Sequence, residues 1–287
     1  MAVNNNILLK LREIKDSLTP VERMIADYVL ENIYEIPRLS IKVLALRSKT
    51  SDASVLRFCK TLGYDGYRDF IVSISASLGS MNDEEEDQYT DIRPGDDLQT
   101  IITNIPHNNC KSIEDTLMVI DRGEIEKAVQ LIRSTNKIDF YGMGASGLVC
   151  MDAQQKFMRI NKMCHAYTDG HSQLTAATLL CEGDVAVIIS NSGNTLECVE
   201  ALEAAKEAGA SVIAITRYGK NTLADKADIV LFISSPEITI RSGAMGSRIA
   251  MLSVIDILFA GVASAEYNHV KKYLTKTHNI LKNKHMG

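Results

Sequence analysis

Two glycine- and serine-rich loops in the second half of the chain carry residue types that suit the binding of an anion. Residues 142–147 read Gly-Met-Gly-Ala-Ser-Gly, and residues 190–195 read Ser-Asn-Ser-Gly-Asn-Thr. Each loop follows a predicted strand and opens a predicted helix, whose N-terminal N–H groups and dipole favour negative charge. The glycines let the backbone approach an anion closely. The second loop adds three hydroxyl donors, Ser190, Ser192 and Thr195. Together the loops predict a site for a phosphate group.

The first loop also fits a different phosphate-binding pattern. It satisfies G-x-G-x-x-G, and Asp169 follows it by about 22 residues, as in a dinucleotide-binding fingerprint. An NAD-responsive Rossmann domain is therefore an alternative. The second loop favours a single phosphomonoester, because a Rossmann site needs no cluster of hydroxyls after its third strand.

The segments that position these loops alternate between helix and strand from about residue 112 onward. Five short, nearly continuous apolar runs have the pattern of parallel strands that are buried on both faces. These runs are Ile138–Tyr141, Met163–Tyr167, Val185–Ile189, Val212–Thr216 and Ile229–Ile233. A helix is predicted at Leu196–Ala208, before Gly209, and an apolar helix at Ser247–Ala263. We therefore expect residues 109–287 to form a doubly wound α/β domain with a five-stranded parallel sheet.

Residues 1–80 have the pattern of an all-helical domain. A helix is expected from about Ile7 to Ser17, and Thr19 and Glu22 then form a predicted capping box. The apolar residues of the next helix recur every four residues, at Ile25, Val29 and Ile33. The segment after this domain is acidic, with eight carboxylates between residues 81 and 97. We assign residues 81–108 to a solvated acidic linker.

A pair of short helices in the first domain has the spacing of a helix-turn-helix. Ser40 is placed to cap the first helix, residues 48–50 make the turn, and Ser51 is placed to cap the second, Asp52 to Leu62. The residues expected to pack inward are Val43, Leu44 and Leu46 on the first helix and Val55, Phe58, Cys59 and Leu62 on the second. The outer face of the second helix is expected to carry Ala53, Ser54, Arg57, Lys60 and Thr61.

This outer face has the chemistry to meet DNA. The N–H groups at the start of the second helix suit a phosphate, and Ser54 and Arg57 could reach base edges. The net charge of −5 argues against nucleic acid, but residues 38–68 hold seven basic and two acidic residues, and a local basic patch decides phosphate contacts. The alternative is a helical bundle with a solvated basic face. The candidate DNA-binding residues are Ser51, Ala53, Ser54, Arg57, Lys60 and Arg68.

The amino-acid sequences of both domains resemble one known family. Residues 39–67, above all the run Arg-Phe-Cys-Lys-Thr-Leu-Gly at 57–63, resemble the N-terminal domain of RpiR-family transcription regulators, and the resemblance covers about residues 6–80. The loop pair resembles the SIS (sugar isomerase) domain over about residues 110–265. Residues 243–250 also look like that family's. The resemblance implies a regulator whose affinity for operator DNA is controlled by a phosphorylated sugar.

The resemblance also implies a ligand site. The residues that it assigns to the sugar phosphate are Ser146, Ser190, Ser192 and Thr195, and their loop neighbours Gly144, Asn191 and Gly193 join this candidate site. His171, after the second strand, could bond a sugar hydroxyl, although a surface histidine without a role is an equal alternative. Arg248 could reach the ligand of its own or a neighbouring subunit, or form a structural ion pair.

An enzyme of the SIS class needs more than phosphate capture, because isomerisation requires a base that moves a proton between adjacent carbons. The Glu-Leu-Lys-His-Gly-Pro run of aminosugar-synthesising isomerases is replaced here by residues 168–174, Thr-Asp-Gly-His-Ser-Gln-Leu. Glu237 is a candidate base, but a lone loop glutamate is usually solvated. We therefore expect no catalytic residues and sensing without turnover, with a sugar-phosphate isomerase as the alternative.

Partners and location follow from the same features. A helix-turn-helix monomer reads only a half-site, so we expect dimers on double-stranded operator DNA, and the SIS resemblance implies a homodimer or homotetramer. The family resemblance also implies an N-acetylated aminosugar 6-phosphate as effector, and we expect repression of sugar or aminosugar catabolism genes. The six cysteines form no CxxC pair, and we expect no metal and no cofactor. No uninterrupted apolar run approaches the ~18 residues of a membrane span, and no signal pattern opens the chain, so we expect a cytoplasmic protein.

Overall fold

The computed structural model describes residues 7, 11, 14–15, 18–33, 35–78, 95–235 and 244–282. Its contacts divide the chain into two compact units, one formed mainly by residues up to Asn108 and the other mainly by residues from Asn109. Each unit has its own buried apolar core. Most of the helix predicted at residues 7–17, and residues 81–94 of the predicted linker, lie outside the described residues.

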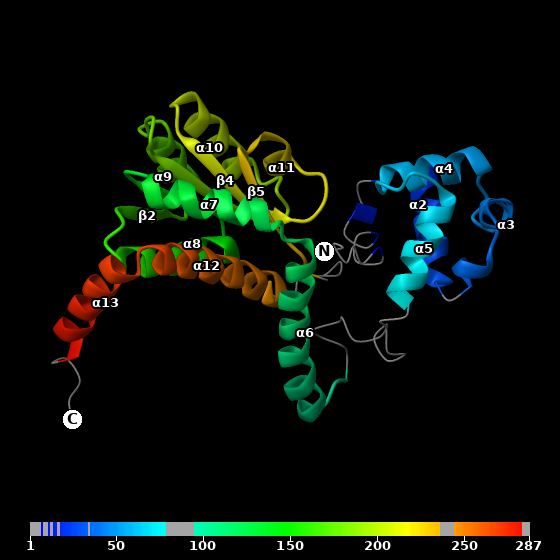
Figure 1. Ribbon diagram of the computed structural model, residues 1–287, viewed down its shortest axis with the longest axis horizontal. Coiled ribbons are helices and arrows are strands. Elements are labelled where there is room, and N and C mark those ends of the chain that lie inside the picture. The colour runs from blue at the N-terminus through cyan, green and yellow to red at the C-terminus, as the bar shows by residue number, and fades with distance from the viewer. Residues whose placement is uncertain are drawn as a thin grey trace. The chain divides into compact units, whose positions relative to one another are not determined.

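The first unit is all helical, as predicted (Figure 1). Its elements are α2 (Pro20–Glu31), the 3₁₀ turn η2 (Ile36–Arg38), α3 (Ile41–Arg47), α4 (Asp52–Thr61) and α5 (Tyr67–Leu78). The capping box predicted for α2 forms, because the N–H of Glu22 donates to the Thr19 hydroxyl and the N–H of Thr19 donates to the Glu22 carboxylate. Phe58 of α4 meets Phe70 of α5 edge to face, with ring centroids 5.8 Å apart. These aromatic rings lie in the core with the predicted inward residues Ile25, Val29 and Ile33.

Helix α6 (Leu98–Val119) corrects the predicted extent of the linker. The prediction assigns residues 81–108 to the linker, but residues 98–108 form the first half of this helix. An internal proline, Pro106, and frequent polar residues obscure the helical pattern in the sequence. The start signal is nevertheless present, because Asp97 accepts a hydrogen bond from the N–H of Thr100 at 2.7 Å, as N-terminal caps do.

The second unit contains the five predicted strands in one parallel sheet of order β2-β1-β3-β4-β5. The strands are β1 (Ile138–Gly142), β2 (Cys164–Tyr167), β3 (Val185–Ser190), β4 (Ser211–Arg217) and β5 (Ile229–Ile233). Strands β1 and β3 are neighbours, with Gly142 paired to Ile189, so the loops that follow them open side by side at one edge of the sheet. The strand order is that of flavodoxin-like folds and differs from the 3-2-1-4-5-6 order of dinucleotide-binding Rossmann domains.

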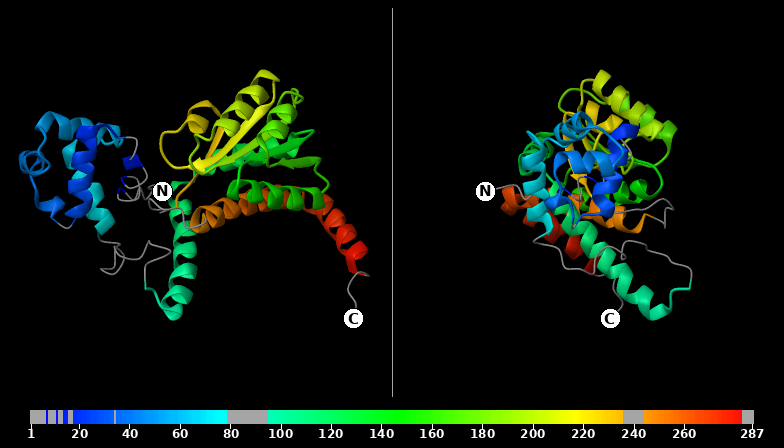
Figure 2. Two further views of the ribbon diagram at one scale, coloured as in Figure 1. Left: turned by 180° about the vertical axis from the view of Figure 1, so that it is seen from behind. Right: turned by 90° about the vertical axis from the view of Figure 1, so that its right-hand side faces the viewer.

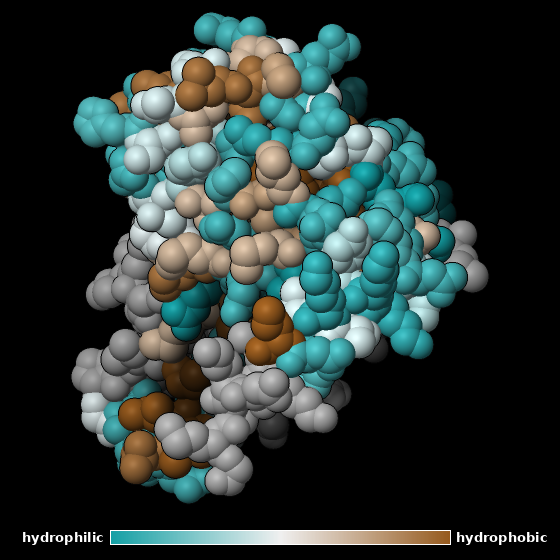
Figure 3. Space-filling view, turned by 90° about the vertical axis from the view of Figure 1, so that its left-hand side faces the viewer, coloured by the Kyte–Doolittle hydropathy of each residue, from teal (hydrophilic) through white to brown (hydrophobic). Residues whose placement is uncertain are grey.

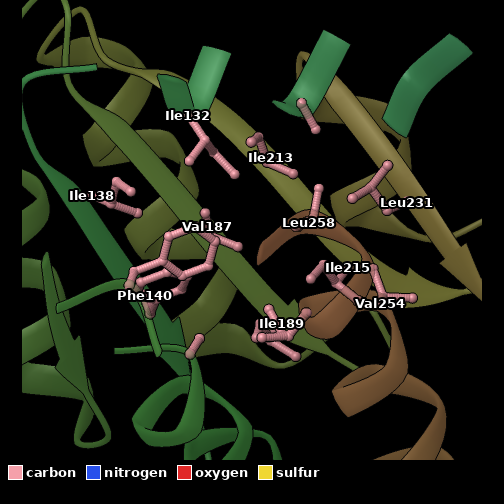
Figure 4. Packing of buried hydrophobic residues seen from close by; sticks show 14 of the residues in the cluster. Ile132, Ile138, Phe140, Val187, Ile189, Ile213, Ile215, Leu231, Val254 and Leu258 are labelled. Carbon is pink, nitrogen blue, oxygen red and sulfur yellow. The ribbon is translucent and has the colours of Figure 1, made fainter. Parts of the chain in front are cut away.

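Helices cover both faces of the sheet (Figures 1 and 2). One face carries α7 (Arg122–Ser134), α8 (Ala145–Arg159) and α12 (Met245–Ala265), and the other carries α9 (Gly170–Ala177), α10 (Leu196–Glu207) and α11 (Thr222–Lys226). Figure 4 shows side chains of β1, β3, β4 and β5 gathered against Val254 and Leu258 of α12. This packing makes the unit doubly wound, as predicted. The last helix is α13 (Tyr267–Lys282).

Helix α12 is the longest apolar segment in this core. By length and composition it is the one helix in the described part of the chain that could cross a membrane. Its side chains at Ala250, Val254, Leu258 and Val262 are instead fully buried in the core beneath the sheet. Exposed hydrophobic residues are spread over several elements, and the face in Figure 3 shows them as separate patches among hydrophilic residues.

Candidate functional sites

A pocket of about 250 Å³ lies at the edge of the sheet where β1 and β3 end. Its described lining comes from the two predicted loops and from the first turns of α12. The lining residues are Met143, Gly144, Ala145, Ser146, Ser190, Asn191, Ser192, Thr195, Ala244, Ser247, Arg248 and Met251. The structure thus brings together segments that lie about 100 residues apart in the sequence.

Three hydroxyl groups form a triangle on one side of this pocket. The Oγ of Ser190 lies 3.1 Å from Thr195 Oγ1 and 3.4 Å from Ser192 Oγ, and Ser192 Oγ lies 3.4 Å from Thr195 Oγ1. The backbone N–H groups of Gly193 and Asn194 donate to Ser190 and Ser192, which fixes the loop around the triangle. Because hydroxyl hydrogens rotate, all three groups can turn their donors toward an anion in the pocket.

The three helices that begin at the pocket have no side-chain cap within the described residues. Their N-cap residues are Gly144 of α8, Thr195 of α10 and Ala244 of α12, and none accepts a hydrogen bond from its helix through a side chain. By contrast, the first turns of α2, α3, α4, α7, α9 and α11 all donate to a capping side chain. Thr195 is a residue type that caps well, yet its hydroxyl belongs to the triangle instead. Because no side chain caps these helices, their first turns favour an anion in the pocket, although the N–H groups of Ser146 and Gly147 already donate to the carbonyl of Met143.

Two glycines give the loops their shape. Gly144 has φ of 56° and ψ of −124°, a backbone conformation that side chains disfavour. Gly193 has φ of 65°, and a Cβ there would lie 2.0 Å from Oδ1 of Asn221. Asn221 caps α11 through this same oxygen, which accepts from the N–H of Ala224 at 3.0 Å. The hydroxyl-bearing loop is thus pressed against the start of α11 and has little room to move.

The described lining of the pocket has one positively charged residue, Arg248, and one weak contact between a hydroxyl and a sulfur. Arg248 forms no ion pair with any described residue, so the structural ion pair considered for it does not occur among them. Ser146 Oγ contacts the sulfur of Met251 at 3.9 Å, a weak interaction that an anion can displace. Ser247 is 2% exposed and lies beside Arg248 at the start of α12.

Two of the predicted ligand residues lie elsewhere. Gly193 is a buried residue of the second loop, where it packs against Asn221 and does not line the pocket. His171 is exposed in the first turn of α9, and the described lining of the pocket does not include it. Glu237, the candidate base, lies outside the described residues. The lining residues that sequence reasoning missed are Met143, Ala145, Ala244, Ser247 and Met251. The signal for Ser247 was its position next to Arg248.

The acidic residue that a dinucleotide site would need has another role in this structure. In that fingerprint a carboxylate beyond β2 bonds the ribose. Here Asp169 caps α9, accepting from the N–H of Ser172 at 2.9 Å, and these hydrogen bonds lower the pKa of Asp169 below its usual value. Together with the strand order, this geometry removes the basis for a Rossmann site.

The predicted helix-turn-helix is formed by α3 and α4. Both predicted caps are present, since Ser40 accepts from the N–H of Val43 and Ser51 accepts from the N–H of Ser54. The intervening turn places Lys49 at φ of 55°. The inward residues of α4 are buried as predicted. On α3 the prediction was wrong for Leu46, which is 78% exposed, and Val43 is only half-buried, because the short helix turns Ala45 to the core beside Leu44.

The outer face of α4 differs from the prediction at one residue. Ala53, Arg57 and Lys60 are exposed, and so are Ser51 and Arg68. Ser54 is 7% exposed instead of projecting outward, because its hydroxyl lies 2.9 Å from Ser51 Oγ and accepts from Arg57 at 3.3 Å. Ser54 is therefore placed to orient Arg57 and is poorly placed to read a base edge itself.

Glu22 links α2 to this helix. Its carboxylate accepts from the hydroxyl of Thr61 at 2.7 Å and from the hydroxyl of Thr19 at 2.6 Å. Partial burial raises the pKa of Glu22, but the hydrogen bonds from the two threonines outweigh it and the pKa is lowered from 4.5. The ionised carboxylate thus holds the end of α4 against the capping box of α2.

Comparison with known proteins identifies both domains of the chain. Residues 5–81 match the helix-turn-helix domain of the rpiR family, and residues 131–261 match the SIS domain. An uncharacterized HTH-type transcriptional regulator of Caldanaerobacter subterraneus is 46% identical over 276 residues, which are 96% of this chain and 97% of that protein. The chain belongs to the RpiR family of transcriptional regulators. Transcription regulation and DNA binding are thus established for the chain as family properties.

Two further proteins are similar to this chain over most of its length. The regulator HexR of Pseudomonas aeruginosa is 34% identical over 266 residues, 90% of this chain and 89% of that protein. A structure of the Vibrio vulnificus NanR protein complexed with ManNAc-6P has a TM-score of 0.63 and 26% identity, and covers 98% of this chain and 100% of that chain.

Proposed function

We propose that this RpiR-family regulator binds a phosphorylated sugar in the pocket of its SIS domain and that this binding changes its affinity for operator DNA. The observation that carries the proposal is the convergence of three uncapped helix N-termini on a triangle of hydroxyl groups. A phosphate dianion satisfies both sets of donors at once. Each helix end favours a nearby anion by about 0.3–1 kcal/mol, and by up to about 2 kcal/mol when partly buried.

Arg248 and the pocket's size support a phosphomonoester. The guanidinium can complete the charge balance of a dianion that the hydroxyls and N–H groups hold. A volume of about 250 Å³ is near the lower end of ligand pockets, which suits a phosphate with part of its sugar inside. The remaining sugar atoms would then lie toward the mouth of the pocket, where specificity is decided.

The first effector to test is an N-acetylated aminosugar 6-phosphate. The support for this class is the NanR neighbour, which was solved with ManNAc-6P and matches the whole of this chain. In the family at large, such a sensor acts in the cytoplasm, and we expect it to repress genes for sugar or aminosugar catabolism.

We propose sensing without turnover. Isomerisation needs a residue that accepts and returns a proton at carbon. The described residues that line the pocket include no carboxylate, no imidazole and no lysine, so none is suited to that step. Incubation with hexose and aminosugar 6-phosphates, followed by analysis of isomers, tests the proposal, and efficient turnover would contradict it.

A second copy of the chain completes the proposed regulator. Helix α8 exposes an apolar stripe, with Leu148 at 50%, Met151 at 47% and Met158 at 58% exposure. Such a stripe on a helix favours pairing with another apolar surface. Pairing of two SIS domains through α8 would give the homodimer, or a step toward the homotetramer, that two operator half-sites require.

The deciding experiment measures ligand binding and DNA binding on the same full-length protein. A ligand that binds only the folded state stabilises it by about 2.7 kcal/mol at 100 times its Kd. We expect phosphosugars to raise Tm and to shift operator affinity, and NAD(H) to do neither. A protein stabilised by NAD(H) and by no phosphosugar would overturn the proposed function.

A further inference from the structure

Gln173, on α9, is a fully buried polar side chain that the proposed function leaves without a role. It is 0% exposed, and it lies at the edge of the sheet where the anion pocket opens. The described lining of the pocket does not include it. A buried amide at such a place needs a physical reason, because burial of a polar group costs free energy unless its hydrogen bonds are made.

The amide nitrogen of Gln173 joins the ends of two neighbouring strands. Nε2 donates to the carbonyl oxygen of Gly142, the last residue of β1, at 3.0 Å and to that of Tyr167, the last residue of β2, at 2.9 Å. It also contacts the sulfur of Met143, which lines the pocket, at 3.4 Å. The two carbonyl acceptors fix which end of the side chain is the nitrogen.

The amide oxygen of Gln173 has no hydrogen-bond partner among the described residues. The side chain therefore acts here only as a donor of two hydrogen bonds. A structure tolerates an unsatisfied buried oxygen where the rest of the group does something that an apolar side chain cannot. Here the amide nitrogen fixes the carbonyl groups at the ends of β1 and β2, and the first of these directly precedes the pocket residue Met143.

The carbonyl of Gly142 controls the first turn of α8. A Cβ on Gly147 would lie 3.0 Å from this oxygen, so the carbonyl is pressed against the start of the helix. The turn that follows is tight, since the N–H of Ser146 donates to the carbonyl of Met143 at 3.1 Å. A rotation of the peptide after Gly142 would break the hydrogen bond to Gln173 and move this turn, which carries Ser146 of the pocket lining.

We propose that Gln173 is a positioning residue for the phosphate-binding loop. Its amide holds the carbonyl groups of Gly142 and Tyr167 away from the ligand, so that the first turn of α8 and the hydroxyl of Ser146 keep their place at the phosphate. The inference rests on the proposed phosphate site. It adds a residue, outside the lining of that site, which sets the electrostatic character of the loop before any ligand arrives.

The test compares Gln173 with a second glutamine that has a purely structural contact. Gln154 of α8 accepts from the N–H of Ala166 in β2 at 3.0 Å and is not part of the described pocket lining. Gln173→Leu and Gln154→Leu each remove a tether between a helix and a strand. Inorganic phosphate is the probe, and its Kd is measured by calorimetry beside Tm on the full-length protein.

We expect both variants to lower Tm, and only Gln173→Leu to raise the Kd for phosphate, by about tenfold, the size of one lost hydrogen bond. If the leucine variant does not fold, the Kd for phosphate of Gln173→Glu provides a second test. Its carboxylate cannot donate, whereas its protonated form donates once, so its phosphate affinity relative to the unchanged protein should recover as pH falls.

The outcomes separate the two claims. If the unchanged protein does not bind phosphate, the proposed function fails and this inference fails with it. If the unchanged protein binds phosphate and both Gln173 variants bind it equally well at every pH, the site stands and the positioning role of Gln173 is wrong.

Discussion

At the scale of single residues, the proposed site depends most on its hydroxyl groups. Ser190 and Ser192 lie on a loop that is held against Asn221, so only their hydroxyl hydrogens must turn to meet a ligand. Hydrogen bonds to charged groups contribute about 1.5–3 kcal/mol each. Loss of two such bonds should therefore weaken binding of the proposed effector strongly.

Replacement of Ser190 and Ser192 by alanine together should therefore lower phosphosugar affinity by at least about 100-fold. The operator affinity of the ligand-free protein should not change, because the serines lie in the other unit from α4. Calorimetry and a gel-shift titration with and without effector measure the two effects. Ser253→Ala is the matched control, since that hydroxyl bonds only Ile249 of its own helix. A double variant that still responds to effector would mean that the pocket is misassigned.

Arg57 is the residue whose loss should harm DNA binding most. It is exposed on α4, and its contact with Ser54 limits the directions in which it can point. Arg57→Ala should cost about 1–3 kcal/mol of operator affinity if the guanidinium makes a bidentate base contact. Fluorescence anisotropy with operator and scrambled DNA measures this, and Arg122→Ala, 93% exposed in the other unit, is the control. An unchanged affinity removes Arg57 from the reading face.

At the scale of elements, the link between α2 and α4 should make the first unit sensitive to acid. The pKa of Glu22 is lower in the folded unit than its ordinary value of 4.5. A carboxylate with a depressed folded pKa stabilises the fold above its unfolded pKa, and this contribution disappears as pH falls through the folded pKa. The free energy of unfolding should thus drop below about pH 4.5.

Glu22→Gln should flatten that part of the pH profile, and chemical denaturation between about pH 3 and pH 6 measures it. Glu31→Gln, at the other end of α2, keeps the capping box and should leave the profile as it is. If both variants give the same profile as the unchanged protein, the hydrogen bonds of Glu22 are not coupled to folding.

The elements themselves were largely predictable from sequence. The five strands were found because each is an apolar run short enough for a buried strand, and the caps at Thr19, Ser40 and Ser51 marked three helix starts. What failed depended on neighbours that no local pattern shows. The exposure of Leu46 and the burial of Ser54 follow from how short helices pack, and the first half of α6 was hidden by polar residues around Pro106.

The site was predictable only in part, for a similar reason. Its two loops carry their own signature, and the structure brings Ser146, Ser190, Ser192 and Thr195 together in the lining of one pocket. The remaining lining residues come from α12. No local sequence pattern at Ser247 or Met251 indicates that this distant helix returns to the same edge of the sheet. Periodicity predicts what is buried, but tertiary structure decides which buried segments meet.

At the scale of the whole molecule, the proposed regulation depends on two copies that bind DNA together. If α8 pairs the copies, replacing both Met151 and Met158 by glutamate should give monomers and reduce operator affinity by at least about tenfold, because each monomer reads one half-site. Sedimentation velocity and anisotropy measure the two quantities. Leu179→Glu, 74% exposed and outside the stripe, is the control. Dimers that survive the double replacement would place the pairing surface elsewhere.

The hydroxyl triangle has a consequence for how such a regulator responds. Ser190, Ser192 and Thr195 bond one another, so their hydroxyl groups have partners within the loop. A ligand would exchange those bonds for its own, and the net gain is smaller than the number of contacts implies. We therefore expect the proposed sensor to bind its effector with moderate affinity, so that its occupancy follows the concentration of the metabolite.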